Sequence, residues 1–282
     1  MANVQNTTSL NSELFQNLLV QSQYALYENS IARAVATVFD YPVGSGKVVS
    51  VPVWDAIKSS KPAEGTAPDK IGTETNSKTI TLAEHVTYAQ VTDFLRDSAQ
   101  ENVIASLADQ MGMALAEGVD KELIALFSDA GITQALGGAG TELTVADIMK
   151  AAATIRAQKY TGQLFAVVSP LQAYNMKAAL TATTSYQNAT SAGSRVLDQY
   201  YVGSIAGVTI LESALVAADG NGDAVGAVFA PAAFGLAQRG GVSMETQRQA
   251  SARATDVVET VVAGAGILRP ELAVKLTFDA TV

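Results

Sequence analysis

Two places in the sequence carry side chains that could do acid–base or metal chemistry. The only histidine is His85, which stands beside Glu84, and Asp219, Asn221 and Asp223 match the first three ligand positions of a calcium-binding loop. A catalytic histidine needs a nucleophile or an orienting carboxylate within hydrogen-bonding distance. The pattern around His85 predicts an exposed ribbon strand, a poor place to hold such partners, so we interpret His85 as a surface residue.

Two further motif matches are incomplete. In the calcium-like segment, Ala224 stands where a glycine is needed and Ala230 stands where a glutamate closes the site, so we predict a plain turn. Gly44 to Lys47, GSGK, resembles part of a phosphate-binding loop. It lacks the upstream glycine, and Val48 follows instead of Ser or Thr, so we expect a turn before a strand.

The remaining catalytic classes leave no recognisable pattern. The sequence has no GxSxG, HExxH or dinucleotide-binding motif, and the absence of cysteine excludes disulfides, zinc–thiolate sites and thiol catalysis. Carboxylates are plentiful, but nothing singles out a general acid and base pair. We therefore predict no catalytic residue, cofactor or metal site, and a soluble α+β enzyme with an unrecognised carboxylate site stays open as an alternative.

Composition and charge narrow the possible partners. A hydrophobic content of 48% supplies ample material for a core. The sequence contains neither a run of 18 apolar residues nor a basic leader, so we predict neither membrane insertion nor secretion. The net charge of −9 disfavours nonspecific binding of nucleic acid, because phosphate contacts require clustered Lys and Arg. DNA near this protein would be enclosed rather than bound.

The longest predicted element is one helix from Asp93 to Ser128, with Asp93 as its N-cap. Apolar residues recur at three- and four-residue spacing and proline is absent. Unbroken, the helix would extend roughly 54 Å, longer than a compact domain of this size is wide. Gly112 and Gly118 in its interior predict a bend or a tight crossing with another element.

Before this helix, the periodicity is that of strands. Val49, Val51 and Val53 alternate with polar residues, and the stretch from Ile80 to Tyr88 does so on the return, which predicts an antiparallel pair. About twenty polar residues separate the two strands, and a loop that long is uncommon unless it is functional or disordered. A two-stranded ribbon is marginal alone, so we expect it to project and lie on another subunit.

The rest of the chain predicts an arm, an α/β subdomain and a C-terminal sheet. Residues 1–46 contain a short amphipathic helix marked by Leu14, Leu18, Leu19 and Leu26. Residues 143–235 alternate helices and strands, beginning with a capping box at Thr144 and containing an exposed polar excursion near residues 181–197. The β-prone runs Val257 to Ala263 and Leu272 to Phe278 should pack on the long helix.

This order of parts resembles the major capsid proteins of tailed bacteriophages, which have the Hong Kong 97-like capsid fold. The segments ETQR, at Glu245 to Arg248, and GILRPELAVK, at Gly266 to Lys275, are similar in character to the C-termini of that family. The resemblance implies an α+β chain with an N-terminal arm (1–46), an extended loop (47–92), a spine helix and first peripheral part (93–142), an axial domain (143–235) and a C-terminal peripheral part (236–282).

The resemblance also implies a function and partners. The chain would be a non-catalytic shell subunit, assembled in the bacterial host cytoplasm into hexamers and pentamers of an icosahedral virion capsid that encloses double-stranded DNA. A separate scaffolding protein, a portal and a decoration protein would be its partners, with no membrane involved. An encapsulin-like compartment that holds a cargo enzyme is the alternative of the same fold.

Some relatives weld subunits by an isopeptide bond between a loop lysine and an asparagine of the peripheral domain. The predicted subunit-contact residues are charged: Lys58, Lys61, Lys70 and Lys78 at the ribbon, and Arg239, Arg248 and Arg253 near the C-terminus. Apart from Asn102 in the long helix, the later asparagines (Asn175, Asn188 and Asn221) all fall in the axial segment. We therefore predict a non-covalent shell.

Overall fold

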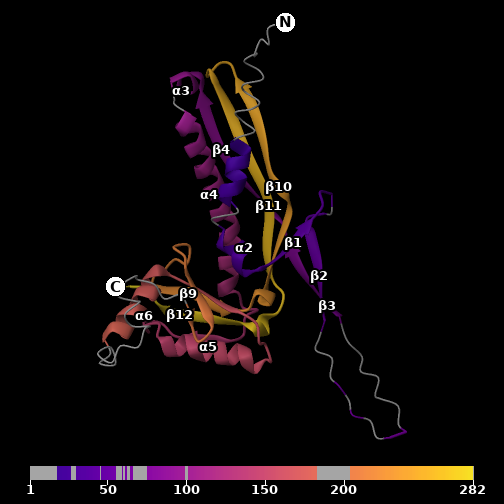
Figure 1. Ribbon diagram of the computed structural model, residues 1–282, viewed down its shortest axis with the longest axis vertical. Helices are drawn as coiled ribbons and strands as arrows, with labels where there is room; N and C mark the ends of the chain where they lie inside the picture. Colours follow the sequence, from indigo (N-terminus) through magenta and orange to yellow (C-terminus); the bar gives the residue numbers. More distant parts are fainter. Residues whose placement is uncertain are drawn as a thin grey trace.

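The computed structural model describes residues 18–26, 30–44, 46–54, 59, 61, 64–65, 75–98, 101–182 and 204–281. An elongated part stands on a compact part, and a two-stranded ribbon projects from the junction between them (Figure 1). Leu14, most of the expected ribbon tip and the polar excursion lie outside the described residues.

The elongated part is built on a four-stranded sheet in the order β1-β10-β11-β4. Its strands are β1 (Thr37–Tyr41), β10 (Phe234–Gln249), β11 (Ala254–Ile267) and β4 (Ala83–Thr92). β1 runs parallel to β10, and the other two pairings are antiparallel. The sequence did not predict β10, because its Gly240, Gly241 and scattered polar residues hide the alternation that its pairing with β11 imposes.

The predicted helix over residues 93–128 appears as α3 (Asp93–Ser98) and α4 (Glu101–Ala125), and the two residues between them lie outside the described part of the chain. The 3-10 turn η1 (Leu126–Ser128) ends the run. The predicted N-cap is wrong by one residue, because the Thr92 hydroxyl accepts the hydrogen bond from the Leu95 amide (3.2 Å). α4, about 38 Å long at 1.5 Å per residue, packs along β11 and β4 as expected (Figure 1).

The tight crossing predicted at the helix glycines is confirmed. Residues 18–26 are helical and lie against α4 at Gly112, where an added Cβ would stand 2.4 Å from the Ser22 carbonyl oxygen. At Gly118 a Cβ would lie 3.0 Å from Nδ1 of His85. Leu18 and Leu26 are buried, so the apolar face of the expected arm is covered by its own subunit.

The described part of the arm continues into the body of the subunit. The short helix α2 (Ile31–Val35) contacts α4, and β1 follows it as an edge strand of the sheet. Residues 30–41 of the predicted N-terminal arm (1–46) therefore pack on the body of their own subunit, which is one of the two ways in which its apolar residues could be covered. The sequence did not predict β1, because five residues with one charge among them carry too little alternation to identify a strand.

The predicted ribbon is shorter than expected. β2 (Val48–Trp54) pairs with β3 (Thr75–Thr81), but the returning strand ends at Leu82, whose amide donates to the Lys47 carbonyl (2.9 Å). β4 then begins in a different sheet, so the expectation that residues 83–92 belong to the ribbon is wrong. The alternation of polar and apolar residues continues through Leu82, and only the change of pairing partner separates β3 from β4.

The compact part contains a six-stranded sheet in the order β5-β12-β9-β6-β8-β7. Its strands are β5 (Ala135–Gly137), β12 (Ala273–Asp279), β9 (Asp223–Phe229), β6 (Leu164–Val168), β8 (Val208–Glu212) and β7 (Ser204–Ile205). β12 had been predicted to pack on the long helix. It instead lies between β5 and β9, where Val274, Leu276 and Phe278 are buried on one face of the sheet and the residues between them are half-buried.

Two helices of the compact part begin where the sequence predicts. Thr144 and Asp147 form the expected capping box at the start of α5 (Val145–Ala157). α6 (Pro170–Ala182) starts with the predicted proline and is held to the sheet by Gln172, whose fully buried amide donates to the carbonyls of Ala224 (2.8 Å) and Phe278 (2.9 Å). Two short 3-10 turns, η3 (Pro231–Ala233) and η4 (Pro270–Leu272), lead into β10 and β12.

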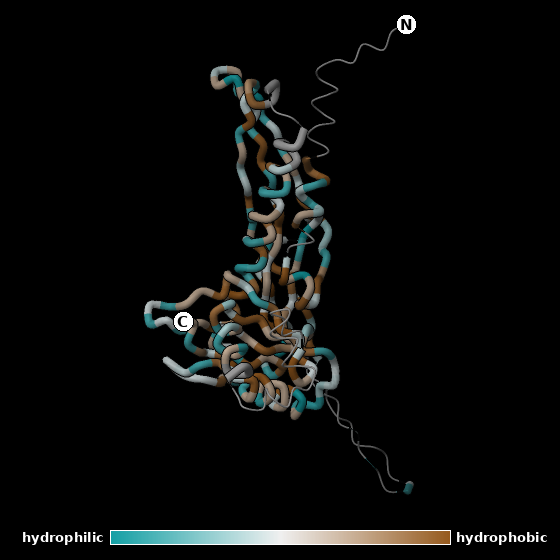
Figure 2. Tube along the Cα trace, turned by 60° about the vertical axis from the view of Figure 1, so that its left-hand side comes forward, coloured by the Kyte–Doolittle hydropathy of each residue, from teal (hydrophilic) through white to brown (hydrophobic). Residues whose placement is uncertain are grey.

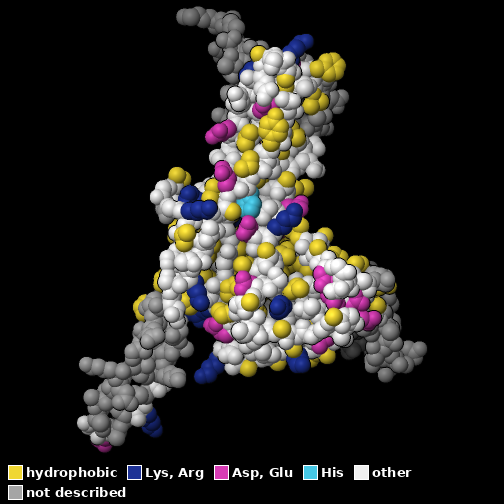
Figure 3. All heavy atoms as spheres, turned by 180° about the vertical axis from the view of Figure 1, so that it is seen from behind, with side chains coloured by type: hydrophobic (Ala, Val, Ile, Leu, Met, Phe, Trp, Pro, Cys, Tyr) yellow, Lys and Arg dark blue, Asp and Glu magenta, His cyan; other side chains and the backbone are white. Residues whose placement is uncertain are grey.

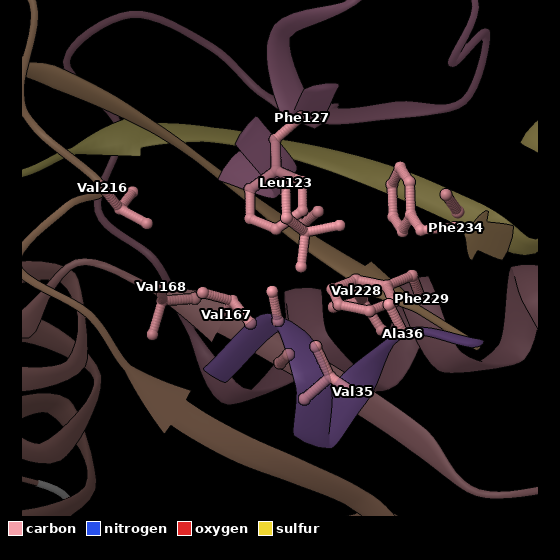
Figure 4. Close-up of a cluster of buried hydrophobic side chains, with 14 of the residues drawn as sticks. Val35, Ala36, Leu123, Phe127, Val167, Val168, Val216, Val228, Phe229 and Phe234 are labelled. Carbon is pink, nitrogen blue, oxygen red and sulfur yellow. The ribbon is translucent and has the colours of Figure 1, made fainter. Parts of the chain in front are cut away.

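One hydrophobic core joins the two parts. Phe127 from η1, Phe229 from β9 and Phe234 from β10 contact one another with ring centroids 4.9 to 5.7 Å apart, and Val35 and Ala36 lie beside them (Figure 4). Apolar segments gather in the compact part and at this junction (Figure 2). Each aromatic pair contributes about 0.5–1.5 kcal/mol beyond the area that it buries, so the trio fixes the angle between the parts.

Candidate assembly surfaces

The residues that could have formed a catalytic or metal site are used within the fold. His85 lies on β4 with its ring against α4, and its Nε2 is 4.0 Å from Glu122 Oε1, so the expectation of an exposed ribbon residue is wrong. Asp219 accepts hydrogen bonds from the amides of Asn221 (2.8 Å) and Asp223 (3.0 Å), as a plain turn requires. Within the described ranges, no group of three or more His, Asp and Glu could hold a metal ion.

Of the four predicted lysines, the structure describes two, Lys61 and Lys78, and it places them in different surroundings. Lys61 is exposed, Lys58 and Lys70 lie outside the described residues, and Lys78 is half-buried on β3. Lys78 lines a hollow of about 490 Å³ between the base of the ribbon and the end of α4, together with Glu122 and Asp129. The hollow therefore brings one cation and two carboxylates to the point where the ribbon leaves the body.

The three predicted arginines have different surroundings. Arg248 forms a bidentate ion pair with Asp93 of the same subunit, with Nη1–Oδ1 3.0 Å and Nη2–Oδ2 2.7 Å, which fixes the end of β10 to the start of α3. Arg253 lies in the exposed β10–β11 turn with a positive φ of 48°. Arg239 stands at the register shift between these strands, and its Nε and Nη2 are buried without a partner in the described part of the chain.

The asparagines considered for crosslinking lie apart from the ribbon. The Asn175 amide donates to the Thr281 carbonyl (3.2 Å), and Asn221 belongs to the exposed turn before β9. The side chain of Asn102 and the whole of Asn188 lie outside the described part of the chain.

The outward face of the ribbon is flat and uncharged. Val48 is 54% exposed and Trp54 is 58% exposed, and the side chains described between them on this face are small or hydroxylated: Ser50, Pro52, Ser77, Thr79 and Thr81. The opposite face packs through Val49, Val51 and Ile80 onto the four-stranded sheet. The inward apolar residues of the ribbon thus attach it to the sheet, and the indole of Trp54 on the outward face stays exposed to solvent.

The sheet of the elongated part also exposes apolar side chains. Val86 and Tyr88 on β4 are 53% and 61% exposed, and their alternation with His85, whose ring lies against α4, turns them away from that helix. Hydrophobic side chains are open to solvent on the elongated part (Figure 3). Beside them, Asp256 accepts from the Gln90 amide (2.9 Å), and its hydrogen bond raises the pKa of the Tyr88 hydroxyl. These side chains make an uncovered sheet face.

Sequence reasoning missed two buried carboxylates that hold the N-terminal segment. Asp120 on α4 accepts from Ser30 Oγ (2.7 Å) and from the amides of Ile31 and Ala32 (both 2.9 Å), and Glu259 on β11 accepts from Ser22 Oγ. A signal for Glu259 was available, because the alternation of β11 puts it on the buried face. No such signal marked Asp120, whose partners lie about ninety residues earlier.

The subunit exposes apolar surfaces of the kind that other subunits cover in an assembly. A projecting ribbon with an exposed indole, an uncovered sheet face and a long helix joined to a compact α/β part are features of a structural protein that works in an assembly. No helix in the described part is long and apolar enough to cross a membrane.

Comparison with known proteins identifies the assembly. Residues 74–276 match the family described as phage capsid protein, which is most of the chain, and the chain belongs to this family. It is a phage major capsid protein, a shell subunit of the virion. No curated protein sequence matches it.

Solved structures confirm the predicted Hong Kong 97-like fold. The capsid structure of the cyanophage P-SCSP1u is similar with a TM-score of 0.67 and 18% identity, covering 89% of each chain. The head structure of Helicobacter pylori bacteriophage KHP40 has a TM-score of 0.67 and 13% identity, covering 90% of this chain and 91% of that one. Gordonia phage Cozz gives 0.65 and 15%, covering 90% and 87%. At these identities, the likeness concerns the fold.

Proposed function

We propose that this subunit assembles with copies of itself into hexamers and pentamers that close into an icosahedral head around double-stranded DNA. The observation that carries the proposal is the projecting ribbon of a phage capsid protein, with Trp54 and Val48 exposed on a face that its own subunit leaves open. A two-stranded ribbon is marginal in water. Covering this face with a neighbouring subunit would stabilise both.

The domain assignment follows the same proposal. The ribbon forms the extended loop, and α4 with the β10–β11 hairpin forms the peripheral domain. The compact part forms the axial domain near the centre of each capsomer, and it includes β5 and β12 besides residues 143–235. This division is supported by the two separate sheets and by the 3-10 turns η3 and η4 at the crossings between them.

The partners and location of the proposed shell are those of a tailed-phage head. We infer assembly in the bacterial host cytoplasm on a separate scaffolding protein, with a portal at one vertex and a decoration protein as a further stabilising partner. The net charge of −9 supports DNA that is enclosed without being gripped, because repeated negative subunits disfavour phosphate contacts. Catalysis has no part in this function.

Electron microscopy of native particles, with measurement of their nucleic-acid content, tests the proposal. We expect closed icosahedral shells tens of nanometres wide that contain double-stranded DNA. Shells that instead contain a cargo enzyme and no DNA would favour an encapsulin-like compartment. If the native source yields only small oligomers, the shell function is wrong.

A further inference from the structure

Three buried polar atoms without partners lie on one face of the elongated sheet. They are Nε2 of His85, Oγ1 of Thr87 and Oε1 of Glu259, and none has a hydrogen-bond partner in the described part of the chain. Thr87 on β4 stands directly opposite Glu259 on β11, and His85 is two residues along the same strand. Directly paired side chains have Cβ atoms about 4.5–5.5 Å apart, so Thr87 and Glu259 are neighbours, and His85 lies on the same face of the sheet.

Of these three residues, Glu259 is the one whose burial in the ionised form would cost the most free energy. Its side chain is fully buried, and Ser22 Oγ is the one donor to its carboxylate among the described residues, bonding to Oε2 and leaving Oε1 without a described partner. An ionised carboxylate offers about four acceptor positions, and a neutral carboxyl needs far less solvation. A single hydroxyl does not compensate for the burial of a full negative charge.

The charges around Glu259 do not neutralise it. From the sheet, it faces Thr87 and Met244, with His85 farther along β4 and closest to Glu122. From α4, Asp120 turns toward the start of α2, and Lys121 pairs with Glu117 at 2.7 Å on the exposed side. Residues 18–26 contribute no Lys or Arg, and their Tyr24 is 67% exposed. No described Lys or Arg forms an ion pair with Glu259.

The cover over Glu259 is the N-terminal helix itself. Ser22 is fully buried against Glu259, Gly112 admits the Ser22 carbonyl, and the Gln23 amide donates to the Val242 carbonyl on β10 (3.1 Å). Residues 18–26 therefore close the site, and lifting them would admit water to the carboxyl.

We propose that Glu259 takes up a proton when residues 18–26 dock onto the sheet and releases it to solvent when they lift, so that pH controls the docking of the N-terminal segment. The docked state holds the neutral carboxylic acid, and the open state holds the hydrated carboxylate and a released proton. The inference stands apart from the proposed shell function, because docking is a property of the single subunit.

The direction of the pH dependence follows from the environment of the carboxyl. Burial raises the pKa of Glu259 above its ordinary value, and the hydrogen bond from Ser22 lowers it by less. A group whose pKa is raised in the docked state contributes stability that is complete below its free pKa and is lost as pH rises through the docked pKa. Docking is therefore tightest below the free pKa of the carboxyl, weakens as the pH rises from there to the docked pKa, and is level above it.

Hydrogen exchange of the full-length unassembled subunit, read by mass spectrometry at several pH values and corrected for intrinsic exchange rates, tests the proposal. Protection of residues 18–26 should fall by up to about tenfold per pH unit between the free and the docked pKa of Glu259, where opening releases one proton, and should level off above the docked pKa. In Glu259→Gln, which copies the neutral carboxyl, the corrected protection should stay level and equal or exceed that of the wild type at high pH.

Two further variants separate Glu259 from its neighbours. Ser22→Ala removes the bond that favours the ionised form and so raises the docked pKa, and the fall in protection should continue to higher pH before it levels off. His85→Gln should keep the wild-type slope, because the proton belongs to Glu259. Parallel pH profiles in the wild type and Glu259→Gln, or a profile abolished by His85→Gln alone, would overturn the proposal. If Glu259→Gln does not fold, the direction of the Ser22→Ala shift decides.

Discussion

At the scale of single residues, Asp120 on α4 caps the start of helix α2, which lies about ninety residues earlier in the chain. Its carboxylate, 4% exposed, receives the Ser30 hydroxyl and the first two amides of α2, a helix of five residues with no side-chain cap of its own at Ser30. Such a short helix is not stable alone, so the position of α2 depends on this carboxylate.

Replacing Asp120 by Ala should lower the free energy of unfolding of the subunit by about 2–4 kcal/mol, because three donors lose their acceptor in a buried place. The matched control is Glu117→Ala on the same helix, whose exposed pair with Lys121 is worth about 0.5 kcal/mol or less. Urea unfolding of both variants measures the difference. Equal losses in the two variants would show that the tertiary cap contributes nothing special.

The sequence predicts local caps better than tertiary ones. The capping box at Thr144 and Asp147 spans four neighbouring residues and was visible in the sequence. The contacts of Asp120 and Glu259 join residues far apart, and the sequence showed only that a charge stood in an apolar run. The ion pair between Arg248 and Asp93 could not be predicted for the same reason, because the type of a charged residue does not identify its partner.

At the scale of elements, the ribbon and α4 differ in how far sequence could place them. The periodic run of α4 and the glycine crossing at Gly112 followed from spacing, since a helix carries its own hydrogen bonds. Strand partners are not encoded locally. The division of the ribbon from β4 at Leu82, the long strand β10 and the move of β12 into the second sheet therefore became visible only in the folded chain.

Deleting residues 59–74 should leave the subunit folded and abolish or mis-size the shells. The deletion keeps β2 and β3, and it keeps the packing of Val51 and Ile80 on the sheet, so unfolding of the body should change little. Thermal unfolding and electron microscopy of the deletion variant measure the two effects. Glu117→Ala, a single change on the exposed side of α4, is the control and should assemble normally. Shells of normal size from the deletion variant would contradict the role proposed for the ribbon.

At the scale of the whole molecule, the described part of the chain brings neither Asn175 nor Asn221 to the ribbon, where either could form a covalent link between subunits. Cysteine is absent, Asn175 is occupied by a backbone carbonyl, and Asn221 lies in a turn of the compact part. We therefore expect contacts between subunits to come from buried apolar area, to which exposed Trp54 and Tyr88 would contribute.

Mature particles boiled in detergent and reductant should therefore run as a single band near 29.2 kDa. Denaturing gel electrophoresis is the measurement, and unassembled subunits on the same gel are the control. A ladder of bands at multiples of the chain mass would show that a crosslinking chemistry joins these subunits after all.

The place of β12 has a consequence for the timing of synthesis. β12 is made after every other described strand, yet it lies between β5 and β9 inside the six-stranded sheet. A nascent chain that has reached the β10–β11 hairpin still has two strand edges of the compact part open, and such edges are prone to wrong pairing. The sheet is completed only when residues 273–279 have left the ribosome, so an unfinished chain does not present a finished subunit to the growing shell.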